Sequence, residues 1–357
     1  MNLGIFNIAQ NPVARIETAL SARAPDRGGL LRRVLRLAFL GWMNASALAL
    51  LAVEMYALNS GYDPEEFYQL ILVPIVGFLA AALVAHFAIM LQTLWLATKI
   101  GGRERHHEER WDMLLMTGIS AQAIVWGKWW GTVRRVWPRY LLLAWWRIGA
   151  GLWLALYVSR ESANTFSGMY MTGEATVFAP QIGHILLAAL FLLGLTLCNM
   201  LLTTACGVWG GLAFRRGALA GAALLRVLGI ILFVVGIGVV SAQFFFGLSS
   251  IALTTSYYSA SVPPLFVDLF SAYSLSLVTL FDNGLTIAGT MTAYTLSVMG
   301  GDGQSTSLLA FVLAFLFATV FYVGLSVLAL WLAQAQAEKY GALRPRETKV
   351  RTEARIR

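Results

Sequence analysis

The sequence has 357 residues and a formal net charge of +8, and 58% of its residues are hydrophobic while only 12% are charged. A soluble domain usually carries about 25% charged residues, so this composition excludes a soluble enzyme and a disordered chain. It predicts a protein embedded in a membrane.

Residues 1–33 precede the first apolar run and contain a predicted surface helix. Asn11 is a favourable N-cap, and Pro12 is favourable at the first helical position. Helical spacing then places apolar residues on one stripe, made of Val13, Ile16, Ala19 and Leu20. We expect this helix to lie at the cytoplasmic surface of the membrane.

Six apolar runs of spanning length follow, at about 34–58, 70–97, 141–158, 182–209, 224–248 and 308–333. The predicted fold is an all-α integral membrane protein with a six-span domain over residues 34–333. A basic cytoplasmic tail over residues 334–357 completes the predicted organisation.

Basic residues gather in every second connection, namely in 1–33, in 99–139, at Arg215 and Arg216, and in 334–357. The connections between these hold a single basic residue, Arg160. Lys and Arg favour the cytoplasmic side of a membrane. We therefore expect the cell membrane as the location, with both termini in the cytoplasm, and we attribute the net charge to topology and not to nucleic-acid binding.

The outer connection 249–307 contains no Lys or Arg, and its part 262–299 is apolar but interrupted at Asp282-Asn283-Gly284. A lipid-exposed helix does not place such a turn at mid-depth, whereas surrounding protein allows it. We expect a re-entrant pair of short helices before the sixth span. A pair of full spans is the alternative.

The cytoplasmic connection 101–139 contains a predicted short amphipathic helix, with an apolar stripe made of Trp111, Leu114 and Leu115. Asp112 lies in its first turn, where the helix dipole favours a negative charge. Thr117-Gly118 is expected to end the helix, and Ser120 to cap the next one. The pattern predicts a stiff helix that is able to receive a push from a soluble partner.

Eight of the 12 Trp residues fall between positions 111 and 153. Trp favours the membrane–water interface, so we expect residues 121–139 to lie along the cytoplasmic interface. An aromatic-lined path for a lipid or amphiphile is the alternative.

At the predicted short helix the chain resembles the ABC-2 family of ATP-binding-cassette transporter permeases. The family carries a stretch like Thr-Leu-Glu-x-Leu-Leu-x-Thr-Pro-Leu-Ser, followed by Ile-x-x-Gly-Lys. The matching positions here are Trp111-Asp112, Leu114-Leu115, Thr117, Ile119-Ser120, Ile124 and Gly127-Lys128. Two positions depart from the pattern, because the family's Gly-Thr is Glu109-Arg110 here and its Pro is Gly118.

In that family the segment is the coupling helix, which docks in a groove of the cytosolic ATPase subunit. The resemblance implies this docking role for Glu109, Arg110, Trp111, Asp112, Leu114, Leu115, Thr117 and Gly118. Residues 11–17 also resemble the family's Asn-Pro-Val-x-x-Arg-Glu start. That likeness implies that Asn11, Pro12, Arg15 and Glu17 belong to a helix that leads into span one and frames the ATPase site.

No phosphate-binding Gly-x4-Gly-Lys-[Ser/Thr] loop occurs in the sequence, because Gly127-Lys128 is followed by Trp129. We expect this chain to be no enzyme and to hold no cofactor of its own. ATP and Mg²⁺ would bind a separate cytosolic P-loop ATPase. Two such ATPase subunits need two membrane halves, so a second copy or a homologue of this chain is an expected partner.

Ionisable residues inside the apolar runs are candidates for a transport path, because they are costly in a membrane. They are Glu54, His86, Arg147 and, in the outer segment, Asp282. Glu54 has the outer interface as its alternative, His86 ordinary packing, and Asp282 a structural turn. Arg147 has pairing with Glu54 or snorkelling to the cytoplasm. His106-His107 lies in a mixed-charge linker, and we expect no metal site.

The sequence therefore predicts a permease subunit that exports a hydrophobic or amphipathic cargo through a membrane, in contact with membrane lipids. One alternative is a membrane scaffold subunit that retains the ABC-2 fold without transport. The other is an intramembrane enzyme that uses His86, Glu54 or Arg147.

Overall fold

The computed structural model describes residues 11–23, 37–46, 48–49, 65–103, 108–169, 182–231, 235, 272, 276 and 308–342. Its helices are α1 (Pro12–Arg23), α3 (Glu65–Gly102), α4 (Glu108–Met116), α5 (Ala121–Met169), α6 (Ile182–Ala213) and α10 (Leu308–Lys339). A further helix, Ala218–Ile231, follows α6. The prediction of an all-α protein is confirmed for these parts of the chain, because all their regular elements are helices.

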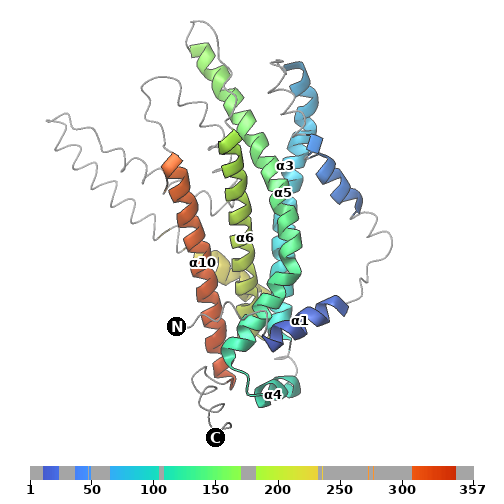
Figure 1. Ribbon diagram of the computed structural model, residues 1–357, viewed down its shortest axis with the longest axis vertical. Helices are drawn as coiled ribbons and strands as arrows, with labels where there is room; N and C mark the ends of the chain where they lie inside the picture. Colours follow the sequence, from blue (N-terminus) through green and yellow to red (C-terminus); the bar gives the residue numbers. More distant parts are fainter. Residues whose placement is uncertain are drawn as a thin grey trace, which may run out of the picture.

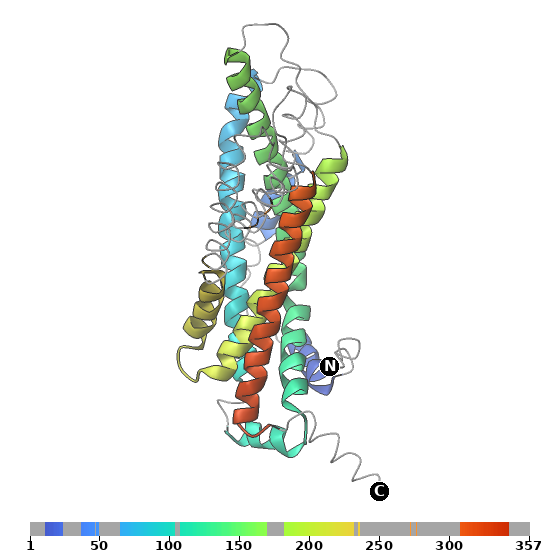
Figure 2. The same cartoon turned by 90° about the vertical axis from the view of Figure 1, so that its left-hand side faces the viewer.

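The long helices α3, α5, α6 and α10 form a bundle (Figures 1 and 2). Helix α6 packs on each of the other three. Small residues bring α3 and α6 close together: a Cβ atom added to Gly101 of α3 would lie 2.7 Å from the carbonyl oxygen of Val208 in α6. Such close backbone approach is typical of helices that pack within a membrane.

Among the residues that the structure describes, three helical segments are long and apolar enough to cross a membrane, namely Gly77–Gly102, Leu186–Ala213 and Leu309–Lys339. They correspond to the second, fourth and sixth predicted runs. Large apolar side chains are exposed along them, for example Phe87 in α3 and Val327 in α10. These exposed side chains suit a surface that faces lipid, so the structure describes a membrane-embedded helical protein.

The other predicted runs are described in part. Helical residues 37–46 and 48–49 belong to the first run, 141–158 lies within α5, and Ala218–Ile231 overlaps the start of the fifth. The predicted re-entrant segment 262–299 lies outside the described residues, apart from positions 272 and 276. The number of spans therefore stays a prediction.

Helix α5 combines two segments that the sequence suggested were separate. Its 49 residues correspond to an ideal length of roughly 73 Å, more than twice the roughly 30 Å of a bilayer's hydrocarbon core. Pro138 lies inside this helix, and Figure 1 shows that α5 changes direction along its length. The stretch 121–139 is thus the beginning of α5, and it packs in the bundle on α1, α3 and α6.

The expectation that residues 121–139 lie along the interface stays a prediction, but the structure adds that the stretch packs on neighbouring helices. One face of this stretch is buried, because its small and apolar residues cover neighbouring helices; Ile124, Val125, Val133 and Val136 are 0–6% exposed. The indole of Trp129 donates a hydrogen bond to the carbonyl oxygen of Leu201 in α6, at 3.4 Å. Tertiary packing thus determines the position of this segment.

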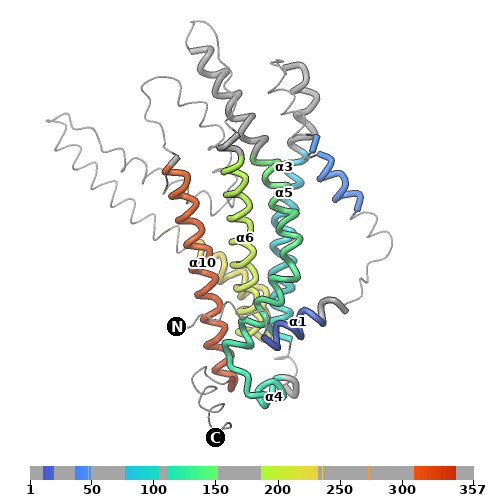
Figure 3. Tube along the Cα trace, viewed as in Figure 1, coloured from blue at the N-terminus to red at the C-terminus, as the bar shows by residue number. Residues whose placement is uncertain are grey.

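One end of the bundle gathers the elements that the sequence assigned to the cytoplasm. Helix α4 lies there, between the last turn of α3 and the first turn of α5 (Figure 3). Helix α1 lies against the beginning of α5 at the same end. The C-terminal ends of α3, α6 and α10 also lie there. Lys99 and Lys339 belong to the ends of α3 and α10, and Arg215 follows the end of α6.

Candidate functional site

Helix α4 ends, and α5 begins, at the residues that the sequence predicts. Gly118 has a φ of 68°, and its N–H donates to the carbonyl oxygen of Leu115 at 3.1 Å, so Gly118 closes the helix in the left-handed conformation. Ser120 then caps α5: its Oγ accepts a hydrogen bond from the N–H of Ala123 at 3.3 Å. These local bonds fix a sharp turn between α4 and α5.

The inner face of α4 is attached to the end of α10. Trp111 is buried, and its indole Nε1 donates to the carbonyl oxygen of Tyr340 at 3.0 Å. Leu114 and Leu115 pack partly buried against the same core. At the turn after α10, a Cβ atom added to Gly341 would lie 3.3 Å from Leu115. These contacts attach the inner face of α4 to the end of α10.

The outer face of α4 is accessible. Met113 is 60% exposed and Met116 is 86% exposed, while Asp112 and Thr117 are exposed beside them. Methionine side chains are flexible and suit adaptable binding surfaces. The structure thus divides the predicted docking residues: Trp111 and, in part, Leu114 and Leu115 face inward, and the sequence analysis did not single out Met113 and Met116. Glu109 and Arg110 lie in α4, whose side chains are described from position 111 on.

Helix α1 begins where the sequence predicts. The N–H of Val13 donates to the side-chain oxygen of Asn11 at 3.0 Å, which is the expected N-cap bond. The side-chain amide of Asn11 also donates to the carbonyl oxygen of Ala123 at 2.7 Å. Asn11 therefore caps α1 and attaches it to the first turn of α5.

Glycine residues of α5 admit α1 into close contact. A Cβ atom added to Gly127 would lie 2.7 Å from the Cβ of Val13. As a result the buried face of α1 differs from the predicted apolar stripe: Val13, Ala14 and Glu17 are buried, whereas Ile16 is 59% exposed. Exposed Ile16 remains available to an adjoining lipid surface.

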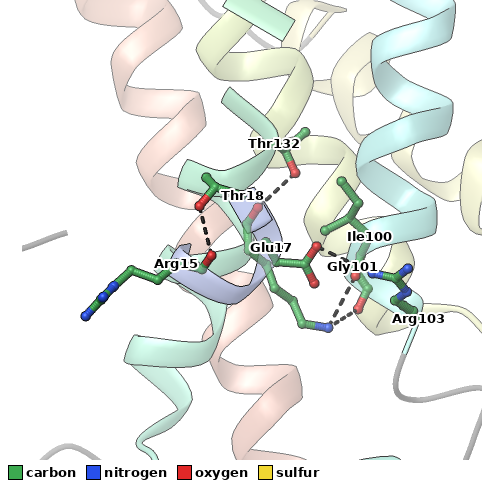
Figure 4. Close-up of polar contacts among 8 residues, drawn as sticks. Arg15, Glu17, Thr18, Ile100, Gly101, Arg103 and Thr132 are labelled. Carbon is green, nitrogen blue, oxygen red and sulfur yellow. Dashed lines mark hydrogen bonds and ion pairs between the residues drawn. The ribbon is translucent and has the colours of Figure 1, made fainter. Parts of the chain in front are cut away.

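A charged junction joins α1, α3 and α5 (Figure 4). Glu17 of α1 is 6% exposed, and its carboxylate lies 3.7 Å from the guanidinium of Arg103, which is half-exposed at the end of α3. Lys128 of α5 is fully buried, and its Nζ donates to the carbonyl oxygens of Ile100 and Gly101 at 3.3 and 2.9 Å. These carbonyls form the negative end of α3, so Lys128 caps that helix. Arg15 is exposed beside the junction.

A second polar group lies within the bundle. Arg147 of α5 is 2% exposed and donates to the hydroxyl of Thr196 in α6 at 2.8 Å. His86 of α3 has a buried Nδ1 that forms no hydrogen bond within the described structure. Two of the four predicted intramembrane candidates, His86 and Arg147, thus lie among the described residues. Glu54 and Asp282 lie outside the described residues.

Arg226 is a member of this group that the sequence analysis missed. It is 9% exposed, and its guanidinium donates to the hydroxyl of Thr203 and to the side-chain oxygen of Asn199, the latter at 2.5 Å. Arg226 is the single charged residue between positions 224 and 248. That isolated charge in an apolar run was the available signal.

Comparisons with known proteins add no relative, since neither a family model, a curated protein nor a solved structure matches this chain. The residues that the structure describes contain no cluster of His, Cys, Asp or Glu able to hold a metal ion. His106 and His107 lie outside those residues.

Proposed function

We propose that this chain is the membrane-spanning subunit of an ABC-2-type transporter, which exports a hydrophobic or amphipathic cargo. ATP and Mg²⁺ bind a separate cytosolic P-loop ATPase that docks on α4. The arrangement of α4 carries the proposal: a short helix at one end of a membrane bundle is anchored by its inner face and leaves its outer face open.

The contacts that anchor α4 suggest how a displacement of this helix is transmitted to the bundle. Movement of α4 acts on α10 through the bond from Trp111 to Tyr340, and on α5 through the turn at Gly118 and Ser120. Helix α10 in turn packs on α6. ATP-driven closure of two ATPase subunits would therefore displace the last span together with the third.

The remaining features of the proposal follow the sequence. We assign six spans, both termini to the cytoplasm, a re-entrant segment over 262–299 and a dimer with a second copy or a homologue. The position of Lys99, Arg103, Arg215 and Lys339 at the α4 end supports this orientation, because basic residues favour the cytoplasmic side.

The test is purification of the tagged full chain from native membranes in mild detergent, with identification of its partners by mass spectrometry. We expect a stoichiometric P-loop ATPase with the wild type. A Met113→Asp/Met116→Asp variant should lose it, because two carboxylates replace the apolar contacts of the outer face. The matched control Met113→Leu/Met116→Leu keeps size and apolarity and should retain the ATPase.

Two results would contradict the proposal. The first is a folded Asp variant that retains the ATPase at the wild-type ratio. The second is an intact wild-type chain that co-purifies with other membrane subunits and without any P-loop ATPase, which would favour the scaffold alternative.

A further inference from the structure

The helix Ala218–Ile231 places a buried positive charge beside α6 while its opposite face is apolar. Arg226 is 9% exposed, whereas the residues on the outer face, Leu224, Val227, Leu228 and Ile231, are 45–65% exposed. A guanidinium oriented inward from a lipid-facing helix is costly without a negative partner. The burial of Arg226 therefore raises the question of which negative group balances its charge.

The described partners of Arg226 are neutral. A guanidinium carries five N–H donors, and the bonds to Thr203 and Asn199 use two of them. Thr203 donates its own hydroxyl proton to the backbone oxygen of Asn199 at 2.7 Å, so towards Arg226 it acts as acceptor. No carboxylate among the described residues pairs with Arg226. Three N–H groups are left over.

Two further buried donors lie near Arg226, namely the side-chain amide of Asn199 and the hydroxyl of Tyr140. The side-chain amide nitrogen of Asn199 and the hydroxyl of Tyr140 are buried and form no hydrogen bond, and both residues are 0% exposed. Tyr140 belongs to α5, and its hydroxyl lies near the hydroxyls of Thr93 and Thr203. Donors from three helices thus converge beside a guanidinium that has no negative partner among the described residues, which is the composition of an anion site.

The depth of Arg226 indicates from where an anion would arrive. Arg226 lies roughly 12 Å along its helix from Ala218, and that helix starts just after Arg215 and Arg216 at the α4 end of the bundle. This distance corresponds to the half of the membrane that adjoins α4. A headgroup from that leaflet has the shortest route, with its acyl chains along the exposed apolar face.

We propose that Arg226, Asn199 and Tyr140 form a binding site for an oxyanion, a phosphate or carboxylate of the kind that an acidic lipid or amphiphile carries. The anion accepts hydrogen bonds from the remaining guanidinium N–H groups, from the Asn199 amide and from the Tyr140 hydroxyl. This site does not depend on ATPase docking.

The test uses the purified full chain in nanodiscs at constant ionic strength, with the thermal unfolding midpoint read from Trp fluorescence. Discs of phosphatidylcholine alone are compared with discs containing an equal part of phosphatidylglycerol, and inorganic phosphate is titrated into the first kind. We expect an oxyanion to raise the midpoint of the wild type. Stabilisation by phosphatidylglycerol alone assigns the site to a lipid headgroup, and stabilisation by phosphate as well assigns it to any accessible oxyanion.

Variants separate this site from general attraction to a basic surface. Arg226→Gln should weaken the stabilising anion about tenfold or more, because it removes charge-assisted bonds. The control Arg216→Gln removes an exposed charge of the same region and should respond like the wild type. Tyr140→Phe deletes one donor, keeps both bonds of Arg226, and should weaken binding of the anion less than Arg226→Gln does. This variant is the test of the site if Arg226→Gln fails to fold.

The proposal is overturned if neither probe stabilises the wild type. It is equally overturned if Arg226→Gln gains as much from the anion as the wild type does. Wild-type affinity in Tyr140→Phe would contradict the composition of the site.

Discussion

The two charged regions of this protein are built differently. At the α4 end, Glu17 faces Arg103, and Lys128 caps the carbonyl end of α3. Inside the bundle, the described partners of Arg226 are the hydroxyl of Thr203 and the side-chain oxygen of Asn199. The charges at the α4 end thus meet a carboxylate or a helix end, whereas the charge of Arg226 meets neutral groups among the described residues.

This contrast indicates two roles. Complementary charges hold three helices in one arrangement and leave little unbalanced charge for binding a ligand. The junction of α1, α3 and α5 therefore suits mechanical attachment. Neutral oxygens compensate a guanidinium only in part, so the inner group suits recognition of an anion. The predictions below test this division, from the largest expected effect to the smallest.

Lys128→Met should produce the largest loss of stability. It leaves the carbonyl oxygens of Ile100 and Gly101 without their buried cap, and we expect the free energy of unfolding in detergent to fall by about 3 kcal/mol. Lys99→Met removes an exposed lysine from the same helix end and should cost much less. Equal losses in the two variants would contradict the capping role of Lys128.

Gly127→Ala should displace α1 without changing any charge. The added Cβ would lie 2.7 Å from the Cβ of Val13, and we expect a loss of about 2 kcal/mol, as for other overpacked contacts. Proteolysis near residue 23 should accelerate as α1 separates from α5. An unchanged cleavage rate and unchanged stability would show that α1 does not require this close approach.

Arg226→Met should cost only about 1 kcal/mol in discs of phosphatidylcholine, because the lost bonds reach neutral groups and an uncompensated buried charge disappears with them. Chemical unfolding of the variant beside Lys128→Met measures the difference. A loss as large as that of Lys128→Met would remove the distinction between the two regions.

The ion pair between Glu17 and Arg103 should have the smallest effect. Arg103 is about half-exposed and the atoms are 3.7 Å apart, so we expect a coupling energy of about 0.5 kcal/mol. A double-mutant cycle with Glu17→Gln and Arg103→Gln measures it, and the coupling should shrink at high salt. A coupling of several kcal/mol that is insensitive to salt would place the pair among the buried ones.

The residues that cap and end the helices were predictable from the sequence, whereas the buried face of each helix was not. Asn11 and Ser120 cap their helices, and Gly118 ends α4, as expected, because these bonds involve residues close in the chain. Which side of α4 is buried depends on Tyr340, more than 200 residues away. The same holds for α1, whose buried face is set by glycine residues of α5.

The extent of elements and the inner polar group show a similar limit. The sequence suggested that 121–139 and the third run were separate, because the Trp-rich composition favoured an interfacial position, whereas the two form one continuous helix. Arg226 stands alone in its run, and its importance becomes visible only when Asn199 and Tyr140 are brought beside it. Contacts between distant segments were needed in each case.

The most direct test of the proposed transporter role is photo-cross-linking in native membranes from α4. A photoreactive residue replaces Met116 on the outer face in one experiment and Trp111 on the inner face in the other. We predict that position 116 captures a P-loop ATPase, identified by its own nucleotide-binding sequence, whereas position 111 yields cross-links within the chain. Capture of the ATPase from position 111 and not from position 116, or from neither, would contradict docking on the outer face of α4.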